Sequence, residues 1–470
     1  MSVSLMPNLL SHLLAPSDAQ SVATFVLIYD QRPLPEGHLR FKQILGRVRS
    51  RLKHYPQFQR LLRAPGILGT PQWTQDERFD VEFHVRHLAL PKPGDWRQFC
   101  IQVARLHSRP LDMSRPPWEI SVVEGLDNIS WLGKGHFAMV CKVHRALMDP
   151  KQALDLIWSL HDESHPEPAG TSDASIALRP ITGLIGHGLG FALRPFEAAV
   201  AQARDTLRRS GEHLCPMMQF YHGALSGGVR LPYTRFNTDV SNYRVWQSFS
   251  MAQKQLDRLR EAFDQVEEGD ILLAVIAGAL RLYLEDKTEL PPRELHALRP
   301  SCGSDGQPAP VLRSRDIIDL AIHTPDPALR LEQLIRNRRQ AGLMPQTTSG
   351  AVTVPTRWMT DAIGLALAEQ RAQAGIPLAN TALIDVSGDD RPLSLLQAPL
   401  VYFSSVAEIT NGLGLTHLAT RHNGYLNLSV TSCREMLPDP DFYRDCLERS
   451  FVELFDAASG PQRHPEKMHD

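Results

Sequence analysis

The chain has 470 residues, and at about 100–200 residues per domain this length predicts two domains. With 43% hydrophobic and 22% charged residues, the composition is that of a folded globular protein and excludes a fibrous or wholly disordered chain. Fifty basic and fifty-two acidic residues give a formal charge of −2, so the sequence lacks the basic excess of a nucleic-acid-binding domain and predicts no nucleic-acid partner.

The sequence also indicates a compartment. Six cysteines are scattered without a CxxC pair, which is typical of small buried residues in a reducing environment. The apolar N-terminal run is interrupted by Asn8, Ser11 and His12 and has no positive region before it, so it predicts no signal peptide. No stretch of about 18 uninterrupted apolar residues occurs. We therefore expect a cytoplasmic protein without a membrane-spanning helix.

The first half of the chain alternates strand-like and helix-like patterns. A β-branched and aromatic run predicts a strand at Val22–Tyr29, and apolar residues at helical spacing predict a helix over Phe41–Leu52. Further strands are expected at Trp118–Val123 and His136–Val143, followed by a helix that starts at Asp149. This alternation predicts an α/β fold.

After about residue 162, a stretch rich in proline, glycine, serine and acidic residues predicts a linker. A second alternating region begins near Tyr243. Its expected helices and strands lie at Leu256–Phe263, Ile271–Leu284, Val401–Val406, Leu415–Ala419 and Tyr425–Val430, with a closing helix over residues 440–457. We therefore predict an N-terminal domain at 1–165, a helical crossover at 166–224 and a C-terminal domain at 225–470.

Three segments combine residue types that suggest a functional site. Residues 106–120 hold three prolines, two arginines and an aromatic residue next to an acid, just before a strand. Residues 142–150 (KVHRALMDP) lead from the end of a strand into a helix. Residues 269–283 form a helix with one face of small residues.

In this order and spacing, the three segments resemble the PLWE-like segment, the HHxxxDG motif and the Asn-Asp-initiated helix of the bacterial wax ester synthase/diacylglycerol acyltransferase family. Residues 231–237 and 385–388 are similar to further family segments. The resemblance implies two chloramphenicol-acetyltransferase-like α/β domains with an interdomain channel, joined by a helical crossover. It also implies acyl-CoA as co-substrate, a long-chain alcohol or diacylglycerol as acceptor, and no separate cofactor.

In the HHxxxDG motif the second histidine is the general base that removes the hydroxyl proton as the alcohol attacks the thioester. With Asp149 as the aspartate, His144 takes the place of the first histidine and Arg145 that of the second, while Pro150 replaces the glycine. A guanidinium stays protonated and cannot accept this proton. Loss of a general base typically costs roughly 10²–10⁴-fold in rate. The resemblance therefore implies His144, Arg145 and Asp149 as the catalytic positions, with the base position altered.

Each catalytic candidate also has a structural interpretation. Asp149 before Pro150 is a well-formed helix start, which explains the aspartate without catalysis. His144 at a strand end is either a core histidine or a substrate-orienting group. Arg145 either pairs with a carboxylate or binds the phosphates of CoA.

The resemblance further implies Trp118, Glu119 and Asp270 as substrate-binding residues, although Trp118 and Glu119 equally fit a buttress beside the channel. The nineteen histidines show no HExxH or other metal-ligand spacing, so we expect no metal site. Residues 181–209 join an apolar stretch to several arginines and are interpreted either as a helical arm or as a surface that contacts a membrane or lipid droplet.

Three functions follow from this pattern. The first is an O-acyltransferase in which His144 serves in place of the missing base. The second is a catalytically silent homologue that binds acyl-CoA or lipid, or partners an active paralogue. The third is a condensation-type or other CoA acyltransferase with a non-lipid acceptor, which the Pro-Pro-Trp-Glu segment disfavours.

Overall fold

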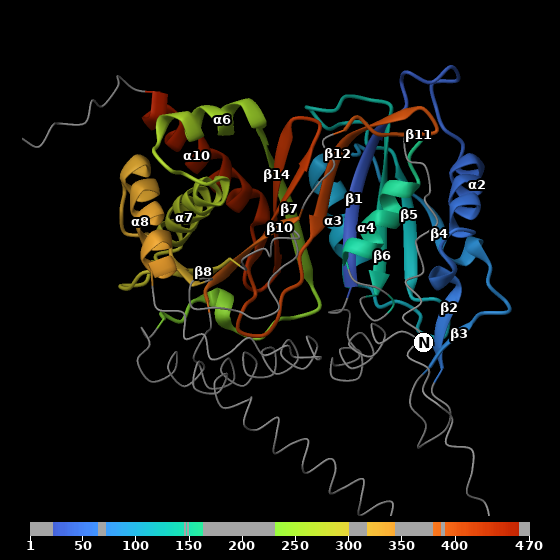
Figure 1. Ribbon diagram of the computed structural model, residues 1–470, viewed down its shortest axis with the longest axis horizontal. Coiled ribbons are helices and arrows are strands. Elements are labelled where there is room, and N and C mark those ends of the chain that lie inside the picture. The colour runs from blue at the N-terminus through green and yellow to red at the C-terminus, as the bar shows by residue number, and fades with distance from the viewer. Residues whose placement is uncertain are drawn as a thin grey trace, which may run out of the picture.

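The computed structural model describes residues 22–63, 72–144, 147, 150–162, 231–299, 317–343, 379–386 and 391–459. Within these residues, two six-stranded sheets, each packed with helices, form two lobes that lie side by side (Figure 1). The expected two-lobed α/β fold is confirmed. The domain boundaries drawn from the sequence stay a prediction.

The first sheet has the strand order β11-β12-β1-β6-β5-β4. Its strands are β1 (Val22–Asp30), β4 (Val85–Ala89), β5 (Trp118–Glu124), β6 (His136–His144), β11 (Ser394–Leu395) and β12 (Ala398–Val406). Its helices are α2 (Phe41–Leu52), α3 (Trp96–Ser108) and α4 (Pro150–Ser159). Met139 of β6 packs with α2 and α4, whereas the next residue, Val140, packs with α3. Helices therefore cover both faces of the sheet, which explains why β6 is buried at nearly every position.

The second sheet has the strand order β7-β14-β13-β10-β8-β9. Its strands are β7 (Arg244–Ala252), β8 (His296–Leu298), β9 (Ile317–Asp319), β10 (Thr381–Val386), β13 (Thr416–His422) and β14 (Tyr425–Cys433). Its helices are α6 (Gln253–Ala262), α7 (Glu268–Asp286), α8 (Pro327–Leu343) and α10 (Pro440–Ser459). The remaining short elements are η1 (Pro56–Gln59), η2 (Val81–Phe83), η3 (Arg235–Asn237) and the hairpin of β2 (Arg60–Arg63) and β3 (Gln72–Gln75).

Helix α7 is buried along most of its length between the sheet and helices α8 and α10. Its small residues let these neighbours approach closely. A Cβ atom on Gly278 would lie 2.1 Å from Oγ of Ser450 and 2.7 Å from a guanidinium nitrogen of Arg330. The small-residue face noted in the sequence is therefore a packing surface.

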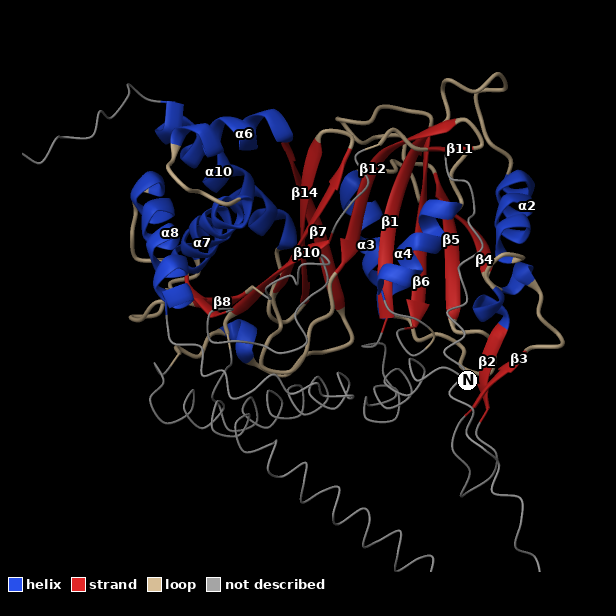
Figure 2. Cartoon of the chain, in the orientation of Figure 1, coloured by secondary structure: helices blue, strands red, loops and turns tan. Residues whose placement is uncertain are grey.

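Strand β12 joins the two lobes. It follows the second lobe in sequence but pairs with β1, as the orange strand beside the blue one in Figure 1 shows. The carbonyl of Phe403 accepts hydrogen bonds from Thr420 and Asn427, and the carbonyl of Ser405 accepts them from Trp246 and Ser429. Side chains of the second sheet thus satisfy main-chain groups of β12, which lies on the side of the first sheet that is next to the second sheet in Figure 2.

The sequence located most long elements but not their partners. The strands predicted at Val22–Tyr29, Trp118–Val123 and His136–Val143 are confirmed, as is the helix that contains Ile271–Leu284. The strand predicted at Val401–Val406 also exists, but it lies in the first sheet, whereas the sequence placed it in the second domain. An apolar pattern predicts a strand without specifying the sheet that it joins.

Candidate active site

The end of β6 positions His144. Register pairing places His144 directly opposite Val22, the first residue of β1 that the structure describes. The backbone N–H of His144 donates to the carbonyl of Pro117 at 3.0 Å, which ties this strand end to the start of β5. The side chain of His144 is half-buried. The first histidine position of the motif therefore lies at the end of a central strand of the first sheet and is only half-buried.

The loop after His144 is described only in part. Leu147 donates its backbone N–H to the carbonyl of His144 at 2.9 Å, and its side chain is buried in the core of the first lobe. Helix α4 then starts at Pro150, as the sequence predicted. Arg145 and Asp149 lie outside the described residues, so their catalytic roles stay predictions.

A buried lysine lies two residues before His144 on the same face of β6. The side chain of Lys142 is 4% exposed, and its ammonium donates to the carbonyls of Leu106 at 3.0 Å, His107 at 2.9 Å and Arg109. These carbonyls belong to the C-terminal turn of α3 and the residue that follows it, where a cation is favoured by the helix dipole. Burial lowers the pKa of Lys142 to about 8, against an opposing effect of nearby Glu119.

Trp118 faces the other side of the sheet. It pairs with Val143 and packs in the core shared with α2 and α4, whereas Lys142 and His144 face the α3 side. Its indole N–H donates to the carbonyl of Phe58 at 2.8 Å, and its ring stacks on His84 at 4.5 Å. These contacts support the buttress interpretation, and substrate binding by Trp118 stays a prediction.

Glu119 lies on the same face as Lys142, its direct cross-strand neighbour. Its carboxylate forms an ion pair with Arg86 of β4 at 3.1 Å and accepts a hydrogen bond from Ser121 at 3.3 Å. With a side chain that is 15% exposed, Glu119 is positioned near the strand end that carries His144. Substrate binding by Glu119 stays a prediction.

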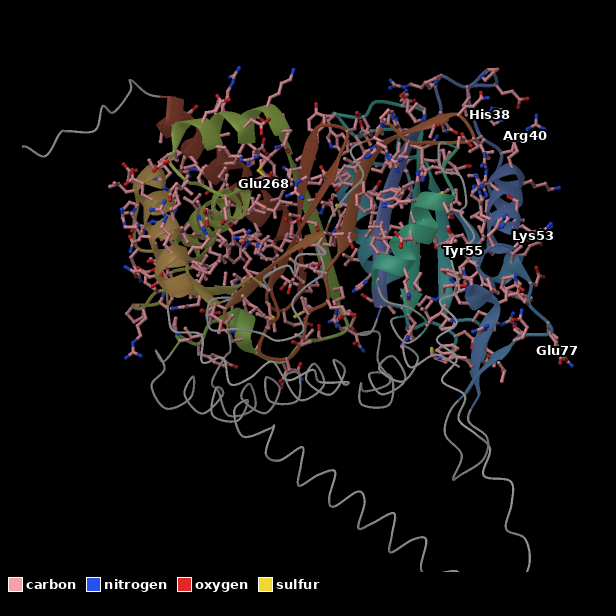
Figure 3. All side chains as sticks on the ribbon, in the orientation of Figure 1. His38, Arg40, Lys53, Tyr55, Glu77 and Glu268 are labelled. Atoms are coloured by element: carbon pink, nitrogen blue, oxygen red, sulfur yellow. The ribbon has the colours of Figure 1, made fainter. Side chains whose placement is uncertain are left out.

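Asp270 is buried at the start of α7 in the second lobe. Its carboxylate accepts the backbone N–H of Glu267 and pairs with Arg338 of α8 at 2.9 Å. Glu268, labelled in Figure 3, begins the same helix and pairs with Arg421 of β13. Asp270 is 1% exposed, so its described contacts fix α7 to α8, and its predicted role in substrate binding stays a prediction.

Sequence reasoning missed Lys142 and Arg338. The signal for Lys142 was present, because a lone lysine within the apolar run HFAMVCKV requires a buried partner. The sequence also drew attention to residues 231–237 but did not predict what they do. Asn237 donates to the carbonyls of Ala379 and Gly412, both at 2.9 Å, so this residue ties three distant parts of the second lobe together.

The described part of the chain holds no group of three His, Cys, Asp or Glu side chains that could bind a metal ion. Among its helices, none is both long and apolar enough to span a bilayer. The chemistry available at the end of β6 is therefore that of the imidazole of His144, the ammonium of Lys142 and the carboxylate of Glu119.

Comparison with known proteins identifies the family. Residues 14–268 match the family model of the wax ester synthase/diacylglycerol acyltransferase catalytic domain, and residues 316–455 match that of the family's C-terminal domain. The chain belongs to the wax ester synthase/diacylglycerol acyltransferase family. The two matched ranges together include nearly all strands of both lobes, so the fold of both lobes is that of the family.

Relatives and solved structures of similar length support this membership. A Mycobacterium tuberculosis protein whose name assigns it to the diacylglycerol O-acyltransferases is 28% identical over 431 residues, covering 80% of this chain and 82% of that protein. The O-acyltransferase WSD of Acinetobacter baylyi is 27% identical over 413 residues, covering 83% and 84%. The wax ester synthase/diacylglycerol acyltransferase of Marinobacter aquaeolei has a TM-score of 0.67 at 23% identity, covering 96% and 98%. The first condensation domain of the CDA synthetase shares the fold at a TM-score of 0.53 and 13% identity, covering 98% and 96%.

Proposed function

We propose that the chain is an acyl-CoA-dependent O-acyltransferase that transfers a fatty acyl group from CoA to a long-chain alcohol or diacylglycerol. The observation that carries this proposal is the match of both halves of the chain to the two domains of the family. The names of relatives that align with about four fifths of the chain support acyl transfer over a silent homologue.

In this proposal the imidazole of His144 replaces the missing base. An unprotonated ring nitrogen accepts the proton of the acceptor hydroxyl, and the oxygen attacks the thioester carbonyl carbon. The C–S bond breaks as the ester forms, and the CoA thiolate takes the proton back from the imidazolium. The half-buried position of His144 at the end of β6 supports this role, because a substrate can approach a strand end but not a core residue.

The neighbouring positions complete the proposed site. The guanidinium of Arg145 stays charged and would bind an anionic group of CoA, for which arginine is well suited. Asp149 would hold the loop at the start of α4. We propose that the substrates reach this loop through a channel between the two lobes, on the face of the first sheet that carries His144.

The test is CoA release by purified protein with acyl-CoA and a long-chain alcohol or diacylglycerol. His144→Ala should lower the rate by at least about 10²-fold, because it removes the proposed proton acceptor. His87→Ala is the control, since His87 is an exposed histidine on β4 of the same sheet. The double substitution Arg145→His with Pro150→Gly should raise the rate above that of the parent, because it restores the family's base.

Two outcomes would contradict the proposal. Activity that survives His144→Ala would remove His144 from the chemistry. Saturable acyl-CoA binding without acceptor-dependent CoA release would establish the silent homologue instead.

We further propose that residues 181–209 contact a lipid surface, because the sequence joins an apolar stretch to Arg194, Arg204, Arg208 and Arg209 and the proposed acceptors are water-insoluble. The protein should float with anionic vesicles at low salt, and replacing the last three arginines with glutamine should reduce this flotation. Equal flotation of both proteins would contradict an electrostatic contact through this segment.

A further inference from the structure

The last turn of α3 is attached to two neighbouring strands at the level of one residue pair. Lys142 of β6 and Thr24 of β1 are direct cross-strand partners. The ammonium of Lys142 donates to the carbonyls of Leu106 and His107, while the hydroxyl of Thr24 is hydrogen-bonded to Nδ1 of His107 at 2.9 Å. Thr24, Lys142 and His107 are all buried. The end of α3 is therefore held against the sheet two residue pairs before His144.

The segment that follows α3 is also held at both of its ends by β6. We call residues 109–117 the proline loop, because it contains three prolines. At its start, the carbonyl of Arg109 accepts a hydrogen bond from Lys142. At its end, the carbonyl of Pro117 accepts the backbone N–H of His144 at 3.0 Å. Two residues of β6 thus fix the loop, and the second of them is the proposed proton acceptor.

The middle of the proline loop has its own local order. Asp112 accepts hydrogen bonds from the backbone and hydroxyl of Ser114 and forms an ion pair with Arg115 at 3.4 Å. The guanidinium of Arg115 lies 3.8 Å from the ring centre of Phe83. These contacts order the middle of the loop, so its position relative to His144 depends on how its two ends are held.

We propose that Lys142 is a positioning residue of the acyl-transfer reaction, which fixes the proline loop beside the end of β6 and so sets the place of His144 in the site. This inference rests on the proposed function, because it assigns Lys142 a part in that reaction. Lys142 touches main-chain carbonyls and no reacting atom, so it acts through the backbone. A neutral methylene chain of the same length would keep the packing but lose all three hydrogen bonds.

The charge on Lys142 gives the proposal a pH dependence. The charged and titratable groups that face it are Glu119 on β5, Arg109 after α3, His107 on α3 and His144 on its own strand. Burial lowers the pKa of Lys142 to about 8, so the ammonium loses its third donor near that pH. The hold on the proline loop should therefore weaken as the pH rises above about 8.

The experiment compares Lys142→Met with the parent and with Lys287→Met, which removes a surface lysine of the second lobe that pairs with Asp286 and Asp439. Amide hydrogen exchange across residues 109–117 should accelerate about tenfold or more in Lys142→Met, because hydrogen bonds from a charged donor are lost. Exchange in β13 and β14 should not change. The value of kcat should fall about tenfold with KM for acyl-CoA within about twofold. In the parent, kcat should decline above pH 8. This decline should be absent from Lys142→Met.

The two readouts separate this proposal from the proposed function. If the parent releases no CoA, the proposed function fails, and the exchange data still decide whether Lys142 holds the loop. Unchanged exchange at 109–117 in folded Lys142→Met would overturn the proposal, as would a pH profile of kcat that keeps its decline above pH 8. Should Lys142→Met not fold, Thr24→Val tests the same turn from β1. It should accelerate exchange at residues 106–109, and no change there would overturn the proposal.

Discussion

At the end of β6 the ammonium of Lys142 is held by main-chain carbonyls, whereas at the start of α7 the carboxylate of Asp270 is held by the guanidinium of Arg338. Both charges are buried, and both belong to segments that resemble family motifs. The first arrangement uses one charge to fix backbone next to a half-buried histidine. The second is an ion pair between two helices of one lobe.

The difference between these contacts distinguishes a charge that holds a segment beside His144 from a charge that joins two helices. Lys142 donates to three carbonyls of one turn and its continuation, so its charge orders a segment that reaches His144. Asp270 caps its own helix and binds α8, and these contacts end within the second lobe. The two segments, each of which resembles a family motif, therefore make different contacts. One lies near the proposed chemistry, and the other contributes to the packing of α7.

The largest expected effect in this comparison is that of Asp270→Asn. The substitution keeps the shape and the helix cap but removes the charge that faces Arg338, which keeps a second ion pair with Glu267 at 2.7 Å. We expect the free energy of unfolding to fall by about 2 kcal/mol, less than for a fully isolated buried pair. Denaturation in urea measures this change.

Asp257→Asn on α6 is the matched control. Asp257 is half-exposed and lies 3.9 Å from Arg260, so its loss should cost less than about 0.5 kcal/mol. If Asp270 binds substrate instead, Asp270→Asn should raise KM while the free energy of unfolding stays unchanged. That outcome would contradict the scaffolding role assigned to the start of α7.

The fold was largely predictable from the sequence because its long elements have strong periodic patterns. The mostly apolar run of β6 and the buried run of α7 each predict one element type. The strands β8 and β9, of three residues each, were not predicted, because so few residues carry little pattern. The sheet that β12 joins was also beyond prediction, since strand pairing depends on the hydrogen bonds that the second sheet supplies.

The candidate site was predictable where residue type determines chemistry. The position of His144 at a strand end followed from the sequence, because the apolar run stops there and a helix signal begins. The opposite orientations of Trp118 and Glu119 follow from strand alternation, yet which of them shares a face with His144 depends on the register between β5 and β6. The acceptors of Lys142 come from a helix 33 to 36 residues away, and no local pattern predicts that contact.

The smallest expected effect concerns Gly269, which precedes Asp270 and stands where the resemblance implies the asparagine of the family's Asn-Asp helix start. The structure gives a physical reason for this difference, since a Cβ atom on Gly269 would lie 2.0 Å from the central guanidinium carbon of Arg299. Gly269→Asn should cost about 1 kcal/mol, because the guanidinium must move away from its place beside Glu267 at 3.6 Å.

The double substitution Gly269→Asn with Arg299→Ala isolates this contact. Arg299→Ala alone should cost about 0.5 kcal/mol, as expected for a partly exposed pair. If the guanidinium occupies the space of the missing side chain, the double variant should be more stable than the sum of the single effects predicts, by about 0.5–1 kcal/mol. Urea midpoints at constant m-value measure this coupling. Additive effects would show that Gly269 and Arg299 vary independently, and the start of α7 would then tolerate the family's asparagine without any adjustment by its neighbour.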